Sequence, residues 1–320
     1  MRIYNLLLIA SLLLYTSFAQ GQGCSDAGFC TMGAMKPDQK FEKKLNFKLR
    51  SVEISHYYGL TRFNDKIFAY TVDLTLGISP KTQAQIKLPY QRVSGPMAET
   101  HGLGDISLSI TRNLISKEHL QLNFTLGGKI PTGNPTKLDE KGRPLPMYYQ
   151  TTLGTYDVVA GLSLINRNWL FAVGYQQALN SVENQFLWGP WSNTLAGNND
   201  ITEDFFGNQV KKYPRSTTLK RGSDIMLRTE RNFRFSRFNI NAGLLYIYRL
   251  NKDKITVNED EQRVNDTNGL AMTGLLGGGY RLTPKSSIKV MFGLRIVKRH
   301  FNPDGLSREF VNTIGYELRF

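Results

Sequence analysis

The chain has 320 residues, with 40 lysines and arginines against 26 aspartates and glutamates, and a mean hydropathy of −0.31. Once the N-terminus is set aside, no apolar run reaches the roughly 18 residues that a membrane-spanning helix needs. These numbers exclude a helical membrane protein. They do not show which surroundings or partners the net charge of +14 interacts with.

The first 19 residues have the pattern of a secretory signal, and we exclude residues 1–19 from the fold. Arg2 precedes an apolar core from Leu6 to Leu14, and Ser17 and Ala19 are small residues at the two recognition positions of a cleavage site. We expect cleavage after Ala19. A membrane anchor is the alternative, but the apolar core is short for one.

Residues 20–40 are rich in glycine, small residues and methionine, and they show no clear period. Cys24 and Cys30 lie six positions apart in an exported chain, so we expect a disulfide between them. Met32 and Met35 would complete a set of soft ligands for Cu(I). The close cysteine pair favours the disulfide, and we expect no metal and no cofactor. The segment is expected to hang in the periplasm or to fold back as a plug.

From about Leu45 onward, apolar and polar residues alternate in long runs, which is the period of β-strands. In the clearest run, every second residue from Phe68 to Ile78 is apolar or aromatic. The parity changes between Leu49 and Val52, which indicates a bulge near residues 50–51. We predict about twelve strands, an even number that suits a single-chain barrel. They lie near residues 45–58, 68–79, 83–91, 105–111, 120–127, 149–164, 169–175, 224–232, 238–250, 270–282, 288–296 and 310–320.

The last predicted strand carries the same alternation to the end of the chain. Phe310, Ile314, Tyr316, Leu318 and Phe320 share one face. A strand of this length crosses a tilted bilayer path of roughly 9–11 residues. Such a final strand with a terminal aromatic is typical of outer-membrane barrels, and we expect the barrel-assembly machinery to recognise it.

The connections between the strands alternate in length, with tight turns at 79–82, 115–118, 165–168, 234–237 and 283–286 and long connections at 93–104, 131–148, 182–220 and 251–268. Short periplasmic turns and longer outer loops are the rule for outer-membrane barrels. A secreted sandwich or propeller explains neither the strand lengths nor this rhythm. We therefore predict an all-β fold, a transmembrane antiparallel up-and-down β-barrel of residues 41–320, integral to the bacterial outer membrane.

In such a barrel the basic surplus has several possible places. Without Arg2, the mature chain keeps 39 basic and 26 acidic residues. We expect these charges to face lipid and lipopolysaccharide headgroups, anionic solutes or the barrel interior, or to lie on solvated loops. An exported chain does not normally meet nucleic acid, so we expect no such partner. Arg231 falls on the lipid-facing parity near a strand end, where its cost is about 0–1 kcal/mol.

If the apolar parity faces lipid, the other parity faces the lumen and carries both acids and bases. One interpretation is a polar path whose constriction these charges set. The alternative is a salt-bridged interior that fills a narrow barrel. The lumen and constriction candidates are Asp73, Lys87, Asp105, Asp157, Asp224, Arg228, Glu230, Arg249, Lys289, Arg295, Glu317 and Arg319, and Arg281 shares their parity.

The long connection 182–220 carries Phe186 and the candidate aromatic residues Trp188, Trp191, Phe205 and Phe206. Exposed aromatic side chains at a barrel mouth would make a first binding site for an apolar solute, or a lid. They would equally pack the loop against itself.

We expect no catalytic residues and no enzyme. None of His56, His101, His119 and His300 is followed two positions later by the serine of a phospholipase barrel. No Asp-His pair of the outer-membrane protease kind is present either. A Ser-His-acid site built from distant strands has no support in the sequence.

Two short motifs resemble a known family. Residues 102–108 read Gly-Leu-Gly-Asp-Ile-Ser-Leu, and residues 127–133 read Gly-Gly-Lys-Ile-Pro-Thr-Gly. The pair is similar to the outer-membrane family labelled as the meta-pathway of phenol degradation, a relative of the FadL-like hydrophobic-compound channels. The run from Cys24 to Cys30 looks like exported proteins of the Bacteroidetes kind. By their chemistry alone, the glycines shape a loop and Asp105 accepts hydrogen bonds from loop amides.

The resemblance implies a barrel that passes small apolar or aromatic compounds, although it does not establish phenol as the substrate. The Asn-Pro-Ala plug motif of the fatty-acid transporters is not evident. The leading hypothesis is a channel for a small, apolar or aromatic molecule by passive diffusion. The competing hypothesis is a closed structural or partner-binding barrel, because twelve strands leave a narrow lumen that side chains can fill.

Overall fold

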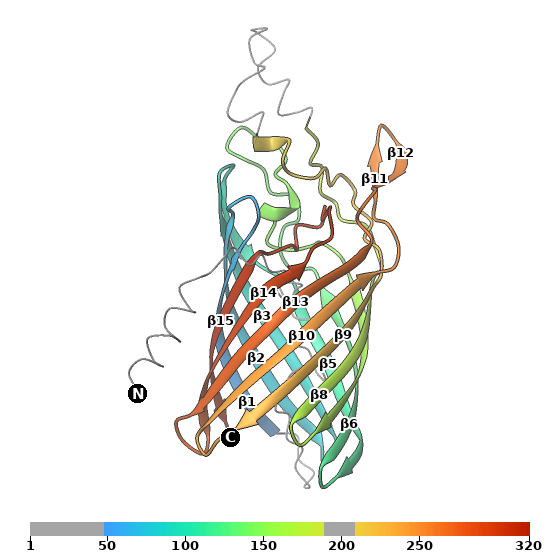
Figure 1. The fold of residues 1–320 in the computed structure, drawn as a ribbon. Coiled ribbons are helices and arrows are strands. Elements are labelled where there is room, and N and C mark those ends of the chain that lie inside the picture. Colours follow the sequence, from blue (N-terminus) through green and yellow to red (C-terminus); the bar gives the residue numbers. More distant parts are fainter. Residues whose placement is uncertain (1–47, 189–208) are drawn as a thin grey trace, which may run out of the picture.

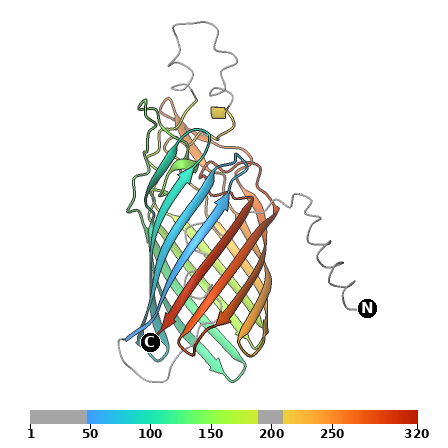
Figure 2. The ribbon, with the colours of Figure 1, turned by 90° about the vertical axis from the view of Figure 1, so that its left-hand side faces the viewer.

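The computed structural model describes residues 48–188 and 209–320. The predicted signal, the plug segment with Cys24 and Cys30, and the loop aromatics Trp191, Phe205 and Phe206 lie outside the described residues. Among the residues described, none of the helices has the length and apolar character to span a membrane. Figures 1 and 2 show that the long described strands form the wall of one tall barrel.

The wall is a closed antiparallel sheet of twelve strand positions, as the alternation predicted. β4 and β5 share one position, because both pair with β3, at its two ends. β1 pairs with β15 and closes the sheet. The strands are β1 (Lys48–Leu60), β2 (Lys66–Ser79), β3 (Thr82–Ser94), β4 (Glu99–Leu103), β5 (Ile106–Lys117), β6 (Leu120–Ile130), β7 (Asp157–Asn166), β8 (Trp169–Ala178), β9 (Asp224–Arg234), β10 (Phe238–Arg249), β13 (Gly269–Arg281), β14 (Ser286–Val297) and β15 (Phe310–Arg319).

Outward and inward residues alternate along the strands. On β2, Tyr70 is 55 % exposed while Asp73 is 4 % exposed. On β6, Leu126 is 52 % exposed while Thr125 is 3 % exposed. Apolar side chains thus cover the outside and polar ones face inward, because lipid solvates the former and buried partners satisfy the latter.

The predicted bulge is present at the barrel seam. The β1–β2 register shifts between Leu49 and Ser51, which leaves Arg50 as the extra residue. The backbone oxygen of Arg50 accepts a 2.9 Å hydrogen bond from the amide of Phe320. The bulge therefore anchors the final residue of the chain.

One predicted strand start is wrong, and two of the predicted long connections contain strands. The strand predicted from Tyr149 begins only at Asp157, since Met147–Tyr149 form the short 3-10 helix η3 and the chain turns at Gly154 with φ 68°. The predicted loop 93–104 is a hairpin that contains β4. The predicted loop 251–268 contains the hairpin of β11 (Lys254–Val257) and β12 (Asp260–Arg263).

Arg231 points outward near the short-turn end of β9, as predicted. Its guanidinium carbon lies 5.4 Å from the centre of the Trp169 ring and 5.0 Å from that of Phe233. The two aromatic faces attract the cation at the edge of the apolar surface.

The depth of an outward position sets the cost of a charge there. We expect Leu276→Arg, in the middle of β13 and 53 % exposed, to lower the free energy of unfolding by about 2–4 kcal/mol in lipid vesicles. Leu282→Arg, one residue beyond the strand end, is the matched control and should cost about 0–1 kcal/mol. Urea unfolding measures both, and equal costs would contradict the membrane depth assigned to β13.

Candidate functional site

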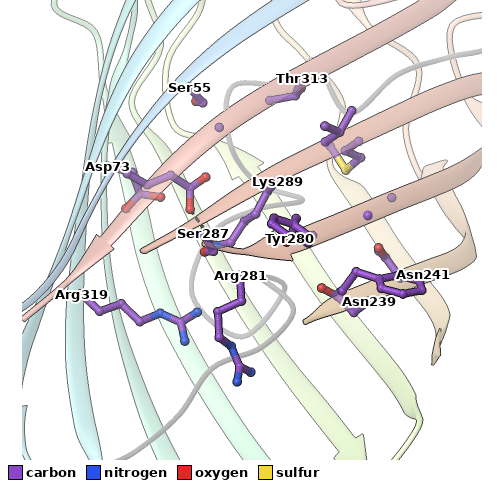
Figure 3. A pocket seen from close by; sticks show the side chains of 18 of the residues that line it. Ser55, Asp73, Asn239, Asn241, Tyr280, Arg281, Ser287, Lys289, Thr313 and Arg319 are labelled. Carbon is purple, nitrogen blue, oxygen red and sulfur yellow. Dashed lines mark hydrogen bonds and ion pairs between the residues drawn. The ribbon is translucent and has the colours of Figure 1, made fainter. Parts of the chain in front are cut away.

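A cavity of about 550 Å³ lies inside the barrel (Figure 3). It extends to four of the short turns, at residues 118–121, 165–167, 234–237 and 283–287. Its inner end is lined by Tyr57, Ile67 and Arg308. We call the two ends of the barrel the short-turn end and the long-loop end.

One wall of the cavity carries a cluster of ion pairs across the closing seam. Glu53 on β1 and Glu317 on β15 lie opposite each other, where two like charges repel. Lys289 on β14 relieves this repulsion, because its Nζ lies 2.9 Å from Glu53 Oε2 and 3.0 Å from Glu317 Oε2. Arg319 adds a 2.7 Å contact to Glu317. The sequence prediction included three of these residues but missed Glu53.

A second pair lines the cavity on β2 and β3. Asp73 and Lys87 lie directly opposite each other across the two strands, with 3.7 Å between Nζ and Oδ2. Gln85 donates a 2.7 Å hydrogen bond to the same carboxylate oxygen. Both contacts hold the Oδ2 oxygen of the Asp73 carboxylate at the cavity wall.

A third cluster lies on β9 and β10. Arg228 binds Glu230 at 2.6 Å, and the Asn241 amide donates a 2.6 Å hydrogen bond to Glu230. A Cβ at Gly277 on β13 would collide with the Asn241 side chain. The bare glycine therefore leaves the room that Asn241 occupies.

At the long-loop end, Arg249 on β10 holds three carboxylates. It binds Asp224 at 2.9 Å, Asp253 at 2.8 Å and Asp304 at 2.8 Å. Asp253 and Asp304 come from loops that follow β10 and β14, so one guanidinium ties two loops to the barrel wall.

The same ion-pair network continues around the wall to β7 and β6. Arg221 Nη1 lies 3.0 Å from Asp157 Oδ2. Lys129 Nζ lies 3.6 Å from Asp157 Oδ2 and 3.7 Å from Asp105 Oδ2. Such a fully buried network is costly to break, because removal of one partner strands a charge.

The pKa values of the two loop carboxylates in this network are shifted in opposite directions. Burial alone would raise the pKa of Asp304, but Arg249 and the other guanidinium groups around it hold that pKa well below its usual range. Burial raises the pKa of Asp253, and the nearby Asp304 adds to this effect although Arg249 opposes it. Arg249 therefore stabilises the ionised form of Asp304.

A cap of packed loops covers the barrel at the long-loop end, and Asp65 joins its parts. Tyr149 and Tyr213 each donate a 2.6 Å hydrogen bond to Asp65 Oδ1, and Thr61 donates one of 2.8 Å to Oδ2. The amide of Met97 donates to the Tyr149 hydroxyl at 3.1 Å. One carboxylate thus connects four loops over an apolar cluster that includes Ile67, Val93, Tyr148, Phe186 and Val210.

The predicted loop aromatic Trp188 belongs to this cap. It packs against the same apolar cluster. Its indole nitrogen donates a 2.9 Å hydrogen bond to the backbone oxygen of Tyr213, and the guanidinium carbon of Arg215 lies 5.2 Å from the centre of its ring. In this arrangement Trp188 packs the loop against neighbouring loops.

All twelve sequence-predicted charged residues lie on the inner side of the wall, but in separate groups. Asp73, Lys87, Asp105, Arg228, Lys289 and Arg319 line the cavity. Glu230 and Glu317 bind lining residues, and Arg295 pairs with Glu309. Asp157, Asp224 and Arg249 lie in the long-loop network.

Sequence reasoning missed several residues of these groups. Lys129 lies on β6 beside Gly128 at the end of an apolar run, and its inward parity was a signal that would have found it. Asp65, Asp253 and Asp304 lie in loops. No sequence periodicity there shows whether a side chain points inward or outward.

The two family-like motifs meet in space. The Thr132 hydroxyl donates to the backbone oxygen of Gly104. Asp105 accepts hydrogen bonds from the Leu153 amide, at 3.2 Å, and from the Thr152 hydroxyl. A Cβ at Gly133 would collide with the backbone oxygen of Leu103. These contacts give both motifs a role in shaping the loops above the wall.

Comparison with protein-family models finds no match, and neither does comparison with curated proteins. Among solved structures, an outer-membrane channel from Pseudomonas putida F1 is similar over 88 % of this chain and 99 % of its own, with 12 % identity and a TM-score of 0.58. The NanC porin covers 84 % of this chain and 100 % of its own, with 9 % identity and a TM-score of 0.46. The CymD monoaromatic hydrocarbon channel covers 95 % of this chain and 98 % of its own, with 9 % identity and a TM-score of 0.39. At these identities, the first similarity supports the barrel fold and nothing finer.

The Asp65 junction makes the cap sensitive to acid. Burial raises the pKa of Asp65 above its usual 3.8, although the hydrogen bonds from Tyr149 and Tyr213 oppose this. The folded cap therefore takes up a proton before the unfolded chain does, so cap stability rises as the pH falls from the raised pKa towards 3.8. It is lost again as the pH rises through the raised pKa.

Hydrogen exchange of the Met97 amide, corrected for its intrinsic pH dependence, measures this effect. We expect slower exchange on the acid side of the raised pKa. The Asp65→Asn variant has no carboxylate to protonate and should abolish this pH dependence. The same dependence in the Asn variant would show that another group is responsible.

Proposed function

We propose that the protein is a channel of the bacterial outer membrane that lets small molecules cross by passive diffusion. The observation that carries this proposal is the cavity of about 550 Å³ enclosed by a closed barrel with an apolar outer surface. The short-turn end, at which this cavity emerges, would face the periplasm, since short turns lie on that side in such barrels. The shared fold with an outer-membrane channel adds support by analogy.

The finer part of the proposal is a preference for apolar or aromatic solutes. It is supported by apolar and aromatic side chains in the lining of the cavity, among them Tyr57, Ile67, Phe238 and Tyr280. The aromatic residues of the cap pack together over the long-loop end of the barrel. Passage from outside then requires the cap to move, because its loops pack over the lumen.

A second candidate function is a closed structural or partner-binding barrel. The packed cap and the long-loop ion-pair network around Arg249 favour it, because both fill the lumen at that end. The two candidates differ in one measurable property, which is ion conductance.

Conductance of the purified, refolded protein in a planar bilayer tests the proposal. Asp65→Ala removes the buried acceptor of the Tyr149 and Tyr213 hydroxyls. Their oxygens lie 3.1 Å apart, so one hydroxyl can donate to the other and one donor is stranded, at about 1–3 kcal/mol. We expect larger or more frequent current steps from this variant than from the wild type. Deletion of residues 20–40 tests in the same way whether that segment is a plug.

Asp139→Ala is the matched control. It removes a carboxylate from the long loop between β6 and β7, where Asp139 binds Arg143 of the same loop at 2.6 Å. It should leave the current unchanged. Absence of ion current in the wild type, in Asp65→Ala and in the deletion variant would reject the channel and favour the closed barrel.

A further inference from the structure

The described lining of the cavity has a strong surplus of positive charge. Ten of its residues are arginine or lysine, and four are aspartate or glutamate. Two further acids, Glu230 and Glu317, bind lining cations from the neighbouring wall. The basic surplus remains after both of these acids are included.

Three acids at the seam and on β2 are each bound to a cation on the same wall. Lys289 binds Glu53 and Glu317, and Lys87 binds Asp73. This wall therefore presents near-neutral clusters to the cavity. The seam cluster is neutral because Arg319 also binds Glu317, so the surplus comes from other lining cations, among them Arg237, Arg281, Lys285 and Arg308.

At the mouth of the cavity lie Arg281 on β13 and Arg319 on β15. Figure 3 shows both guanidinium groups below the level of Lys289, in the opening of the cavity. Arg237 and Lys285 on the adjacent turns also line this opening and are exposed. Four cations therefore surround the entrance at the short-turn end.

At the inner end lies Arg308, which is 6 % exposed and lines the cavity. Its Nη1 donates to the backbone oxygens of Gly305 and Ser307. Its Nε has no hydrogen-bond partner among the described residues. A buried guanidinium at the cavity wall offers charge-assisted hydrogen bonds to a ligand carboxylate.

From this arrangement we infer that the cavity binds small organic anions, with Arg308 as the inner contact and Arg281 and Arg319 at the entrance. Cationic walls around a narrow opening concentrate anions there, and rings of arginine and lysine select anions in pores. The inference deepens the proposed function and, for transport, rests on it. The group recognised would be a carboxylate carried by a small ring or chain.

Benzoate and benzamide are the probes, because they share ring and shape and differ in charge. Binding is measured by titration calorimetry on the full chain in detergent, and permeation by the reversal potential across a planar bilayer in a KCl gradient. We expect benzoate to bind and benzamide to bind several-fold more weakly. We also expect a reversal potential with the sign of anion preference.

The variants separate the two ends of the cavity. Arg281→Gln with Arg319→Gln should lower the anion preference and weaken benzoate binding. Arg308→Gln should weaken benzoate binding more, and Arg308→Lys should restore part of it. Lys252→Gln with Arg263→Gln removes the same charge from exposed outer residues that do not line the cavity and should change neither property.

Calorimetry and conductance test the anion site and the channel separately. A barrel that passes no current but binds benzoate in an arginine-dependent way would reject the channel and support the anion site. Equal affinity for benzoate and benzamide, or cation preference in the wild type, would overturn the anion site. If Arg308→Gln does not fold, as judged by heat-dependent gel mobility, the entrance variant decides.

Discussion

The pairing of β1 with β15 is the constraint on which the rest of the structure depends. It runs from Ser51 opposite Arg319 to Leu60 opposite Phe310. In a bilayer, every backbone donor and acceptor needs a partner within the protein, because no water is present to replace it. Closure removes the two sheet edges and separates the lumen from lipid, so the inner wall can carry charged side chains.

The two ends of the enclosed space use charge in opposite ways. At the long-loop end, Arg249 is surrounded by three carboxylates and fills the space between wall and loops. At the short-turn end, Arg281 and Arg319 border an open cavity. A solute therefore meets a firmly packed barrier on one side and an accessible basic chamber on the other.

The parts of the fold that sequence reasoning predicted are those with a period of two. The inward position of Asp73 followed from its apolar neighbours, and the bulge at Arg50 followed from a change of parity. The same reasoning failed at Tyr149, because residues of the loop after η3 also point into a packed interior. Loop positions such as Asp65 could not be predicted in this way, since their burial depends on other loops folding over them.

The junction at Asp65 has a consequence for how related sequences can vary. Its carboxylate serves hydroxyl groups from two distant loops, those of Tyr149 and Tyr213. Loss of the acid alone strands one of the two hydroxyl donors, since the other can bond its neighbour, and loss of one tyrosine alone leaves an under-solvated carboxylate. Substitutions at these three positions are therefore tolerated mainly in combination. Related chains should replace all three polar residues with apolar ones together rather than one at a time.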